Sequence, residues 1–296
     1  MLVSLTVLGD GLHVKKNFAP FTVLYPELSI SSPPLESSLT GDRVLVASST
    51  RSHLINIEQA LKSFDEVIVE KPVFQDFDID MVSRLNGDDA KRIFENVAFL
   101  EHDSWGYLFS NLGLGPAPKV KCSFVIPHRA MEKFDGFRER LTLTVQDFDL
   151  ILGEVGFYPV ATLEFCLNKL GVDFDPNCLE IGTVGDCPDI YQVRYDNESL
   201  EFMGEFGLGS YKNQCSLEIE GCGSTLSPAY SKPQGKQIKV FCWGTNSLVP
   251  DKTYEWFWQF HVLLNPRLPS SFEMDRWIAR RSILMQFSRM FKERCL

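Results

Sequence analysis

The N-terminal third of the chain alternates between short apolar runs and segments in which apolar residues recur at helical spacing. The runs predict strands over residues 2–8, 27–32, 43–49, 66–72 and 94–100, and the spacing predicts helices over residues 12–24, 54–64 and 76–93. The run at 43–49 is continuous, as expected of a parallel strand that is buried on both faces. This order of strands and helices predicts a Rossmann-like, doubly wound parallel sheet.

Further along the chain the pattern changes to long alternating strands. These are predicted over residues 119–128, 141–146, 179–185, 189–196, 200–207, 214–221 and 238–243. A helix over 155–171, ended by Gly171, interrupts them, and an amphipathic helix over 272–294 closes the chain. We therefore expect an α/β protein of two domains. Residues 1–95 would form a dinucleotide-binding domain, and residues 96–296 an α+β domain with a large, mostly antiparallel sheet for substrate binding and oligomerisation.

Composition narrows the function classes. The net charge of −10 argues against a general nucleic-acid binder, because there is no basic excess to neutralise phosphates. The eight cysteines form no C-x-x-C pair, which favours reduced thiols in a cytoplasmic protein over disulfides or a metal site. The apolar start lacks the basic region of a secretory signal, and no run approaches the roughly 20 apolar residues that a membrane helix needs.

A glycine pair, Gly9 and Gly11, directly follows the first predicted strand. The pair fits the first two positions of the G-x-G-x-x-G phosphate-binding turn, although such a pair is also found in plain tight turns. Val14 takes the place of the third glycine and suggests a helix that is packed slightly further from its strand. The stretch from Gly11 to Asp42 has room for about one βαβ unit of roughly 30 residues, so we expect an abbreviated first half.

The stretch "EKP", Glu70 to Pro72, ends a strand that reads as buried. A single lysine is most often a solvated surface residue. Ligands of open α/β sheets, however, bind outside the carboxyl ends of the strands. Lys71 is therefore a candidate for function.

At these residues the chain resembles the glucose–fructose oxidoreductase/inositol dehydrogenase (Gfo/Idh/MocA) family of nicotinamide-dependent enzymes. The resemblance covers essentially the whole chain and rests on "VLGDG" (7–11), "VASSTRSH" (46–53), "VIVEKPV" (67–73), "FENVAFL" (94–100) and "LGEVGFYPVATLEFCLNKLG" (152–171). The details look most like ketoreductases of nucleotide-linked sugars, through G-x-Y-P at 156–159, F-x-I-P at 124–127 and Y-x-N at 211–213. Two departures are Glu154, where the family usually has Asp, and the bulky stretch 146–156, where it commonly has glycines.

The resemblance implies roles for particular residues. Lys71 and Tyr158 would be catalytic: Tyr158 would donate the proton to a carbonyl, and Lys71 would polarise that carbonyl or lower the pKa of the phenol. The implied cofactor-binding residues are Gly9, Gly11, Leu12, Ser31, Ser32, Ala47, Ser48, Ser49, His53, Glu70, Lys71 and Asn96. The implied substrate-binding residues are His102, Pro127, His128, Glu154, Tyr211 and Asn213, of which the histidines also fit a purely structural role.

The sequence leaves alternatives open both for the identity of the cofactor and for the function. Ser31 and Ser32 stand at the end of the second strand, where an acid would bind the 2′-hydroxyl of NAD, so NADP is slightly favoured over NAD. The main hypothesis is a cytoplasmic, homo-oligomeric NAD(P)H-dependent ketoreductase of a nucleotide-linked sugar. The alternatives are a cofactor-binding regulator or scaffold that lacks catalysis, and an enzyme of the same kind that acts on an imine or a polyol.

Overall fold

The computed structural model describes most of the chain. The described residues are 2–22, 25–35, 39–48, 52–71, 87–101, 103–110, 112, 117–126, 148–149, 151–184, 187–209, 214–220, 222–226, 232–234, 237–239 and 258–295.

The chain forms two compact units, each built from separate stretches of sequence. Unit 1 contains residues 1–101, 231–240 and 254–278, and unit 2 contains residues 102–230, 241–253 and 279–296. The predicted single boundary after residue 95 lies close to the first change of unit. It does not anticipate that later segments return to unit 1.

Unit 1 is built on a five-stranded parallel sheet in the order β2-β1-β3-β4-β5. The strands are β1 (Leu5–Leu8), β2 (Leu28–Ser31), β3 (Gly41–Val46), β4 (Phe64–Val69) and β5 (Ile93–Glu95). The strand order reverses between β1 and β3, which makes this pair the switch point of a doubly wound sheet. The predicted parallel sheet is confirmed, and its five strands agree with the abbreviated first half.

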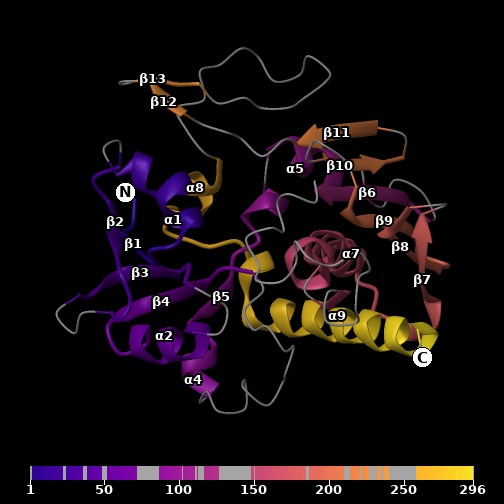
Figure 1. Cartoon of the computed structure of the whole chain (residues 1–296), viewed down its shortest axis with the longest axis horizontal. Helices are drawn as coiled ribbons and strands as arrows, with labels where there is room; N and C mark the ends of the chain where they lie inside the picture. Colours follow the sequence, from indigo (N-terminus) through magenta and orange to yellow (C-terminus); the bar gives the residue numbers. More distant parts are fainter. Residues whose placement is uncertain are drawn as a thin grey trace. The chain divides into compact units, whose positions relative to one another are not determined.

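Helices cover both faces of this sheet, as the continuous apolar runs require. The helices are α1 (Leu12–Asn17), α2 (His53–Ala60), the short α4 (Gly87–Ala90) and α8 (Trp258–Leu263), with 3-10 turns at Ala19–Phe21, Ala98–Glu101 and Ser270–Phe272. Figure 1 shows α1 and α8 on one face and α2 on the other. Ile57 and Ala60 of α2 pack against Val44, Val46 and Val67. The two faces of the sheet are therefore both core.

The segment that returns to unit 1 is fixed by aromatic packing and by one buried arginine. Phe260 of α8 packs against Phe18, Phe21 and Tyr25, with ring centroids 5.0–5.7 Å apart. Arg43, on the amino-terminal half of β3, is 1 % exposed and forms an ion pair with Glu66 of β4.

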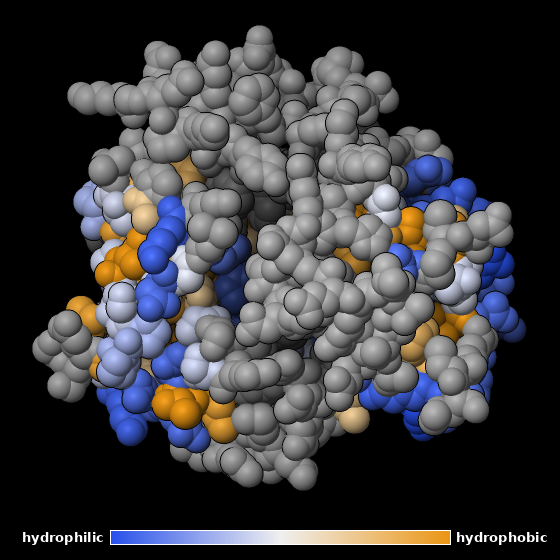
Figure 2. Space-filling model, viewed as in Figure 1, coloured by the Kyte–Doolittle hydropathy of each residue, from blue (hydrophilic) through white to orange (hydrophobic). Residues whose placement is uncertain are grey.

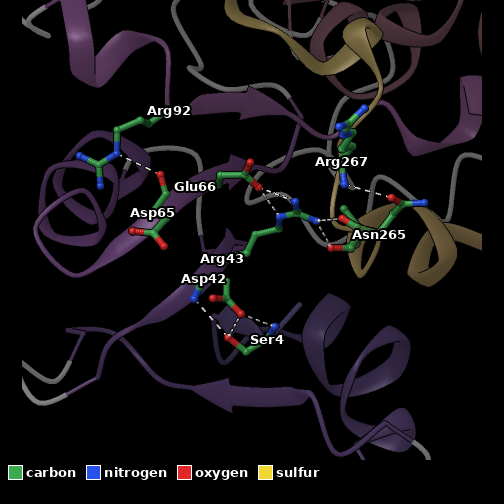
Figure 3. A network of polar contacts seen from close by, with 9 residues as sticks. Ser4, Asp42, Arg43, Asp65, Glu66, Arg92, Asn265 and Arg267 are labelled. Carbon is green, nitrogen blue, oxygen red and sulfur yellow. Dashed lines mark hydrogen bonds and ion pairs between the residues drawn. The ribbon is translucent and has the colours of Figure 1, made fainter. Parts of the chain in front are cut away.

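The Arg43 guanidinium also satisfies the carbonyl groups at the end of α8. It donates to the carbonyl oxygens of Leu263 at 2.5 Å and Asn265 at 2.8 Å, residues about 220 positions away in the sequence (Figure 3). The amide of Val3 donates to the Leu264 carbonyl in the same place. A cation at a helix C-terminus suits both the free carbonyls and the helix dipole. The contact thus ties α8 to the amino ends of the strands.

Unit 2 contains a six-stranded sheet in the order β11-β10-β6-β9-β8-β7. The strands are β6 (Lys119–Ile126), β7 (Leu179–Val184), β8 (Cys187–Asn197), β9 (Leu200–Leu208), β10 (Gln214–Ile219) and β11 (Cys222–Leu226). Only the β6–β9 pair among them is parallel. The predicted mostly antiparallel sheet is confirmed. The strand predicted at 141–146 lies outside the described residues.

The long helix α7 lies on one face of this sheet, and α9 runs alongside α7 (Figure 1). A π-helical turn, Leu152–Gly156, leads into α7 (Phe157–Leu170), and α9 (Met274–Cys295) closes the chain. Gly171 ends α7 in the left-handed conformation, with φ of 67°, as predicted. Arg280 of α9 and Glu164 of α7 form an ion pair at 3.3 Å with both side chains buried. Unit 2 also contains α5 (Asp103–Phe109) and a 3-10 turn at Pro176–Cys178.

Several details differ from the predicted elements. The strand predicted at 94–100 ends at Glu95, and Ala98–Glu101 form a 3-10 turn, while the helix predicted at 12–24 ends at Asn17. Residues Gln237–Lys239 form β13, which pairs with β12 (Lys232–Gln234) in a separate two-stranded sheet instead of joining the large one. Of the helix predicted at 76–93, residues 76–86 lie outside the described part, Gly87–Ala90 form α4, and Ile93 already begins β5.

The visible surface mixes hydrophilic and hydrophobic residues (Figure 2). Among the described residues, the large hydrophobic side chains that are exposed are Leu2, Ile55, Ile278 and Met285. Within that same part of the chain, no helix is long and apolar enough to cross a membrane.

The Arg43 contact predicts a large effect on stability. Arg43→Met should lower the free energy of unfolding by about 2–3 kcal/mol, because Glu66 and two carbonyl groups lose a charged donor. Urea unfolding followed by circular dichroism measures the change. Lys91→Met is the matched control, since its ion pair with Asp88 is exposed and should contribute little. Equal losses in the two variants would contradict a special role for Arg43.

Candidate functional site

The predicted cofactor residues of unit 1 gather at one edge of the parallel sheet. Because the strands are parallel, the residues that end or follow them lie together at the carboxyl edge. The residues placed there are Gly9, Gly11, Leu12, Ser31, Ser32, Ala47, Ser48, Glu70, Lys71 and Asn96. Their common position follows from the topology alone.

Backbone hydrogen bonds continue past the strand ends and fix this edge. The amide of Gly9 donates to the Ser31 carbonyl, and the amide of Ala47 donates to the Leu8 carbonyl, both at 2.9 Å. In the same way Glu70 donates to Val46 at 2.9 Å and Asn96 donates to Val69 at 2.8 Å. The residue after each of these strands is therefore held as firmly as the strand itself.

Glycine stands at these two positions of the turn for different physical reasons. A Cβ on Gly9 would lie 2.6 Å from the Ala47 carbonyl oxygen and 2.9 Å from Val14 Cγ2, so only glycine fits there. Val14 is buried, and the space its side chain needs is supplied by Gly9. A Cβ on Gly11, in contrast, would meet nothing within 4 Å, and Gly11 has an ordinary extended backbone. Gly11 thus leaves open space beside the turn, where a ligand could approach the backbone.

The loop after β3 is held by the start of α2. The buried His53 places Nε2 3.1 Å from the Ser48 carbonyl oxygen, and Asn56 donates to Ser48 Oγ at 2.6 Å. Ser52 Oγ lies 3.3 Å from the same hydroxyl. His53 was predicted to bind cofactor. Because it is only 1 % exposed, its contact with Ser48 instead suits a residue that positions the loop.

A histidine that the sequence reasoning did not select lies at the same edge. His13, in the first turn of α1, places Nε2 3.6 Å from Oε1 of Glu70, and Asn96 Nδ2 donates to that same oxygen at 2.8 Å. The available signal was the place of His13 inside the glycine motif. The contact depends on α1 reaching past the end of β3 to β4, which the sequence does not reveal.

Glu70 is an ionised carboxylate in this arrangement. Burial alone would raise its pKa, but hydrogen bonds from His13 and Asn96, together with the positive charges of His13 and Lys71, outweigh burial and lower the pKa below its ordinary value. Lys71 follows directly, after the end of β4 at Val69. A carboxylate and an ammonium group therefore sit next to one another at the strand end.

In unit 2, the segment "GFYP" is shaped by packing against β9. A Cβ on Gly156 would lie 3.0 Å from the ring of Phe206, and a Cβ on Gly204 would lie 2.8 Å from Pro159. Gly156 and Gly204, which lack a Cβ, therefore allow the start of α7 to lie close on the strand. The π-helical turn before Gly156 adds a local irregularity of a kind that is frequent at functional sites.

Tyr158 is half-buried and oriented by aromatic contacts. Its ring stacks on Phe124 of β6, with centroids 4.4 Å apart and planes 6° from parallel, and Phe157 meets its edge at 6.0 Å. Thr162 Oγ1 donates to the Tyr158 carbonyl at 2.8 Å. Glu154, four residues earlier in the π-helical turn, is also half-buried. The ring position of Tyr158 is thus fixed by aromatic packing.

Several predicted residues lie outside the described part of the chain. These are Ser49, His102, Pro127, His128, Tyr211 and Asn213, and their roles stay predictions. Lys71 belongs to unit 1 and Tyr158 to unit 2. Within the described residues, no group of three or more His, Cys, Asp or Glu side chains could hold a metal ion.

The glycine geometry predicts a difference between two equal substitutions. Gly9→Ala should lower the free energy of unfolding by about 1–3 kcal/mol, because its Cβ would overlap the Ala47 carbonyl. Gly11→Ala should change it by less than about 1 kcal/mol, since open space surrounds that position. Urea denaturation of both variants provides the comparison. Similar losses would show that the turn is not packed as described.

The lowered pKa of Glu70 predicts a pH dependence. Its ionisation stabilises the fold above the unfolded-state pKa of about 4.3, and this contribution is lost as pH falls through the lower folded-state pKa. The difference in unfolding free energy between wild type and Glu70→Gln should therefore shrink as the pH is lowered from about 4.3. The exposed Glu58→Gln controls for the loss of one charge. A difference that grows on acidification would contradict the assigned direction.

No protein-family model matches the sequence, and no curated protein matches it. Solved structures do match. The WlbA (WbpB) dehydrogenase from Thermus thermophilus, solved in complex with NAD and UDP-GlcNAcA, is 12 % identical, with 96 % of this chain and 94 % of that chain covered and a TM-score of 0.63. A Gfo/Idh/MocA family oxidoreductase from Vibrio cholerae is 10 % identical over 99 % of both chains, with a TM-score of 0.63.

A third similar structure is KijD10, a 3-ketoreductase from Actinomadura kijaniata solved with TDP-benzene and NADP. It is 15 % identical over 96 % of both chains, with a TM-score of 0.60. At these identities the likeness concerns the fold. The chain has the two-domain fold of the Gfo/Idh/MocA proteins, as the sequence motifs predicted.

Proposed function

We propose that the chain is a nicotinamide-dependent oxidoreductase that reduces a keto group of a sugar, with a nucleotide-linked sugar as the substrate class. The observation that carries the proposal is the arrangement at the switch point of the parallel sheet. There the open space at Gly11 follows β1, and the Glu70–Lys71 pair follows β4 at the same edge. Open α/β sheets bind dinucleotides at this place.

The described residues at this edge fit such a cofactor. The turn from Gly9 to Gly11 would hold the pyrophosphate, because Gly11 has no side chain in the way. Ser31 and Ser32 at the end of β2 would meet the adenosine ribose, and without an acid there the 2′-phosphate of NADP is tolerated. Similar folds have been solved with NAD and with NADP. We favour NADP slightly.

Lys71 and Tyr158 are the proposed catalytic residues. The bound nicotinamide would supply the hydride. Negative charge then develops on the carbonyl oxygen, and a group that donates a proton there lowers the barrier. A phenol with an ordinary pKa of about 10 carries a proton at neutral pH, so Tyr158 can donate it. The ammonium group of Lys71 would polarise the carbonyl.

The substrate class is supported by the folds that the chain is similar to. One of these structures contains UDP-GlcNAcA, and another is a 3-ketoreductase solved with TDP-benzene. Glu154 precedes Tyr158 by four residues, so both can serve the same substrate. The other proposed substrate residues are His102, Pro127, His128, Tyr211 and Asn213. We further propose that the protein acts in the cytoplasm as a homo-oligomer.

A second candidate function is a cofactor-binding regulator or scaffold without catalysis. The five-stranded sheet favours it, because the order 3-2-1-4-5-6 of a full dinucleotide fold has one strand more. Binding of cofactor without turnover of any keto-sugar in a broad panel would support this second candidate against the first.

Cofactor binding by the wild-type protein and the activity of two variants test the proposed function. Wild-type protein titrated with NADPH and NADH should enhance or shift nicotinamide fluorescence, and absence of binding to either would overturn the proposal. Lys71→Met and Tyr158→Phe should each lower kcat by about 10²–10⁴-fold, the usual share of a general acid, with cofactor binding retained. The Tyr158→Phe change keeps the ring that stacks on Phe124, so its fold should be unaltered. Full activity in both variants would refute the assigned roles.

A further inference from the structure

Two aromatic residues without an assigned role lie in series behind the phenol of Tyr158. The ring of Tyr158 stacks on Phe124, with centroids 4.4 Å apart and planes 6° from parallel. Phe124 is in turn met edge-on by Trp105, with centroids 5.8 Å apart and planes at 78°. Stacked and edge-on pairs are both preferred arrangements of aromatic rings. We call the three rings of Tyr158, Phe124 and Trp105 the tyrosine stack.

The two inner rings of the tyrosine stack are held rigidly within unit 2. Phe124 is 5 % exposed and Trp105 is fully buried. Phe124 belongs to β6, which is paired with β10 on one side and with β9 on the other. Trp105 also meets the ring of Phe109 edge-on, at 6.2 Å. Because buried rings are close-packed, neither can move without its neighbours, and Tyr158 rests on a fixed surface.

The backbone that carries Tyr158 is fixed by other contacts. Thr162 Oγ1 donates to the Tyr158 carbonyl at 2.8 Å. Gly156 lies so close to the ring of Phe206 that an added Cβ would be 3.0 Å from it. Removal of the Phe124 ring should therefore release the side chain of Tyr158 while its backbone stays in place.

A stack of this kind restrains the two torsions that aim a phenol. The hydroxyl oxygen of a tyrosine lies on the axis of the Cβ–Cγ bond, so only χ1 moves the oxygen. The torsion χ2, which is broadly distributed in general, sets the ring plane in which the O–H bond prefers to lie. Two rings in parallel contact allow one combination of both torsions. The tyrosine stack thus restrains the place of the oxygen and the plane of its O–H bond.

We propose that Phe124, supported by Trp105, is a positioning residue for the proton donor Tyr158. This inference rests on the proposed function. In that reaction the carbonyl carbon accepts a hydride, the proton of Tyr158 Oη passes to the carbonyl oxygen, and solvent returns a proton to the phenolate. Transfer of the proton requires the O–H bond to be aimed at the carbonyl oxygen. Phe124 acts through the ring of Tyr158.

Substitution of Phe124 tests the proposal by steady-state kinetics. Phe124→Met removes the ring and fills most of its volume with a flexible side chain, so the fold should persist. For the keto-sugar that wild type reduces fastest, kcat should fall by about 10–100-fold, because the donor is no longer aimed. KM and the dissociation constant of NADPH or NADH should change by less than about twofold, since binding is not altered. Phe124→Tyr keeps the ring and should keep kcat.

A second phenylalanine–tyrosine stack in the same unit provides the matched control. Phe174 stacks on Tyr195, with centroids 5.7 Å apart and planes 24° from parallel. Tyr195 has no part in the proposed reaction, so Phe174→Met should keep the kcat of wild type. Equal losses of kcat in Phe124→Met and Phe174→Met would indicate a general loss of packing and would overturn the inference.

A double variant separates positioning from a structural effect. In the Tyr158→Phe background, Phe124→Met should lower kcat no further, because no hydroxyl is left to aim. A structural effect would instead multiply the two losses. A further tenfold loss in the double variant would therefore overturn the inference.

Nuclear magnetic resonance of isotope-labelled tyrosine rings tests the stack without any activity. The Tyr158 signals, identified by their absence from Tyr158→Phe, should move in Phe124→Met because the ring current of Phe124 is lost. They should stay in place in Phe174→Met, in which the Tyr195 signals move instead. Tyr158 signals that do not respond to Phe124→Met would overturn the inference. If Phe124→Met does not fold, Phe124→Leu removes the ring in its place, with the same expected results.

The outcomes separate the inference from the proposed function. If wild type reduces a keto-sugar and the folded Phe124→Met protein keeps full kcat, only the inference is overturned. If wild type reduces no keto-sugar of a broad panel, the proposed function falls and the inference falls with it.

Discussion

Burial of the parallel sheet on both faces is the constraint on which unit 1 depends. With α1 and α8 on one face and α2 on the other, polar groups can gather only at the two ends of the strands. The amino end is closed, because Arg43 joins Glu66 to the last carbonyls of α8. The carboxyl end keeps open space beside Gly11. The polarity of the sheet thus separates a stabilising end from an end suited to ligand binding.

Much of this organisation could be predicted from the sequence, because it depends on local patterns. The continuous apolar run before Lys71 gave β4, the glycines gave the turn after β1, and Gly171 gave the end of α7. The residues of each pattern are neighbours in the chain, so their spacing carries the information. The placement of the predicted cofactor residues at one edge then follows from the parallel strand order.

What could not be predicted depends on contacts between distant residues. The pairing of Arg43 with the carbonyl of Leu263 spans 220 positions, and no local pattern indicates that α8 returns to unit 1. His13 meets Glu70 only because α1 reaches past β3, which requires the strand order to be known. The burial of His53 likewise depends on how the elements pack and not on a local pattern. A side chain in a turn-and-helix motif can bind a ligand or hold a loop, and the contact of His53 with Ser48, which no local pattern predicts, favours the second role.

The π-helical turn before α7 has a consequence for how this region can vary. A π turn contains one residue more than the α-helical turn it replaces, so the segment Leu152–Gly156 holds an extra residue in phase with the helix that follows. Deleting a single residue there would let the segment relax into an ordinary helix. Everything on its far side would then rotate by about 100° relative to the preceding turn. Length in this short segment, and not only side-chain identity, therefore sets the direction in which the phenol of Tyr158 faces.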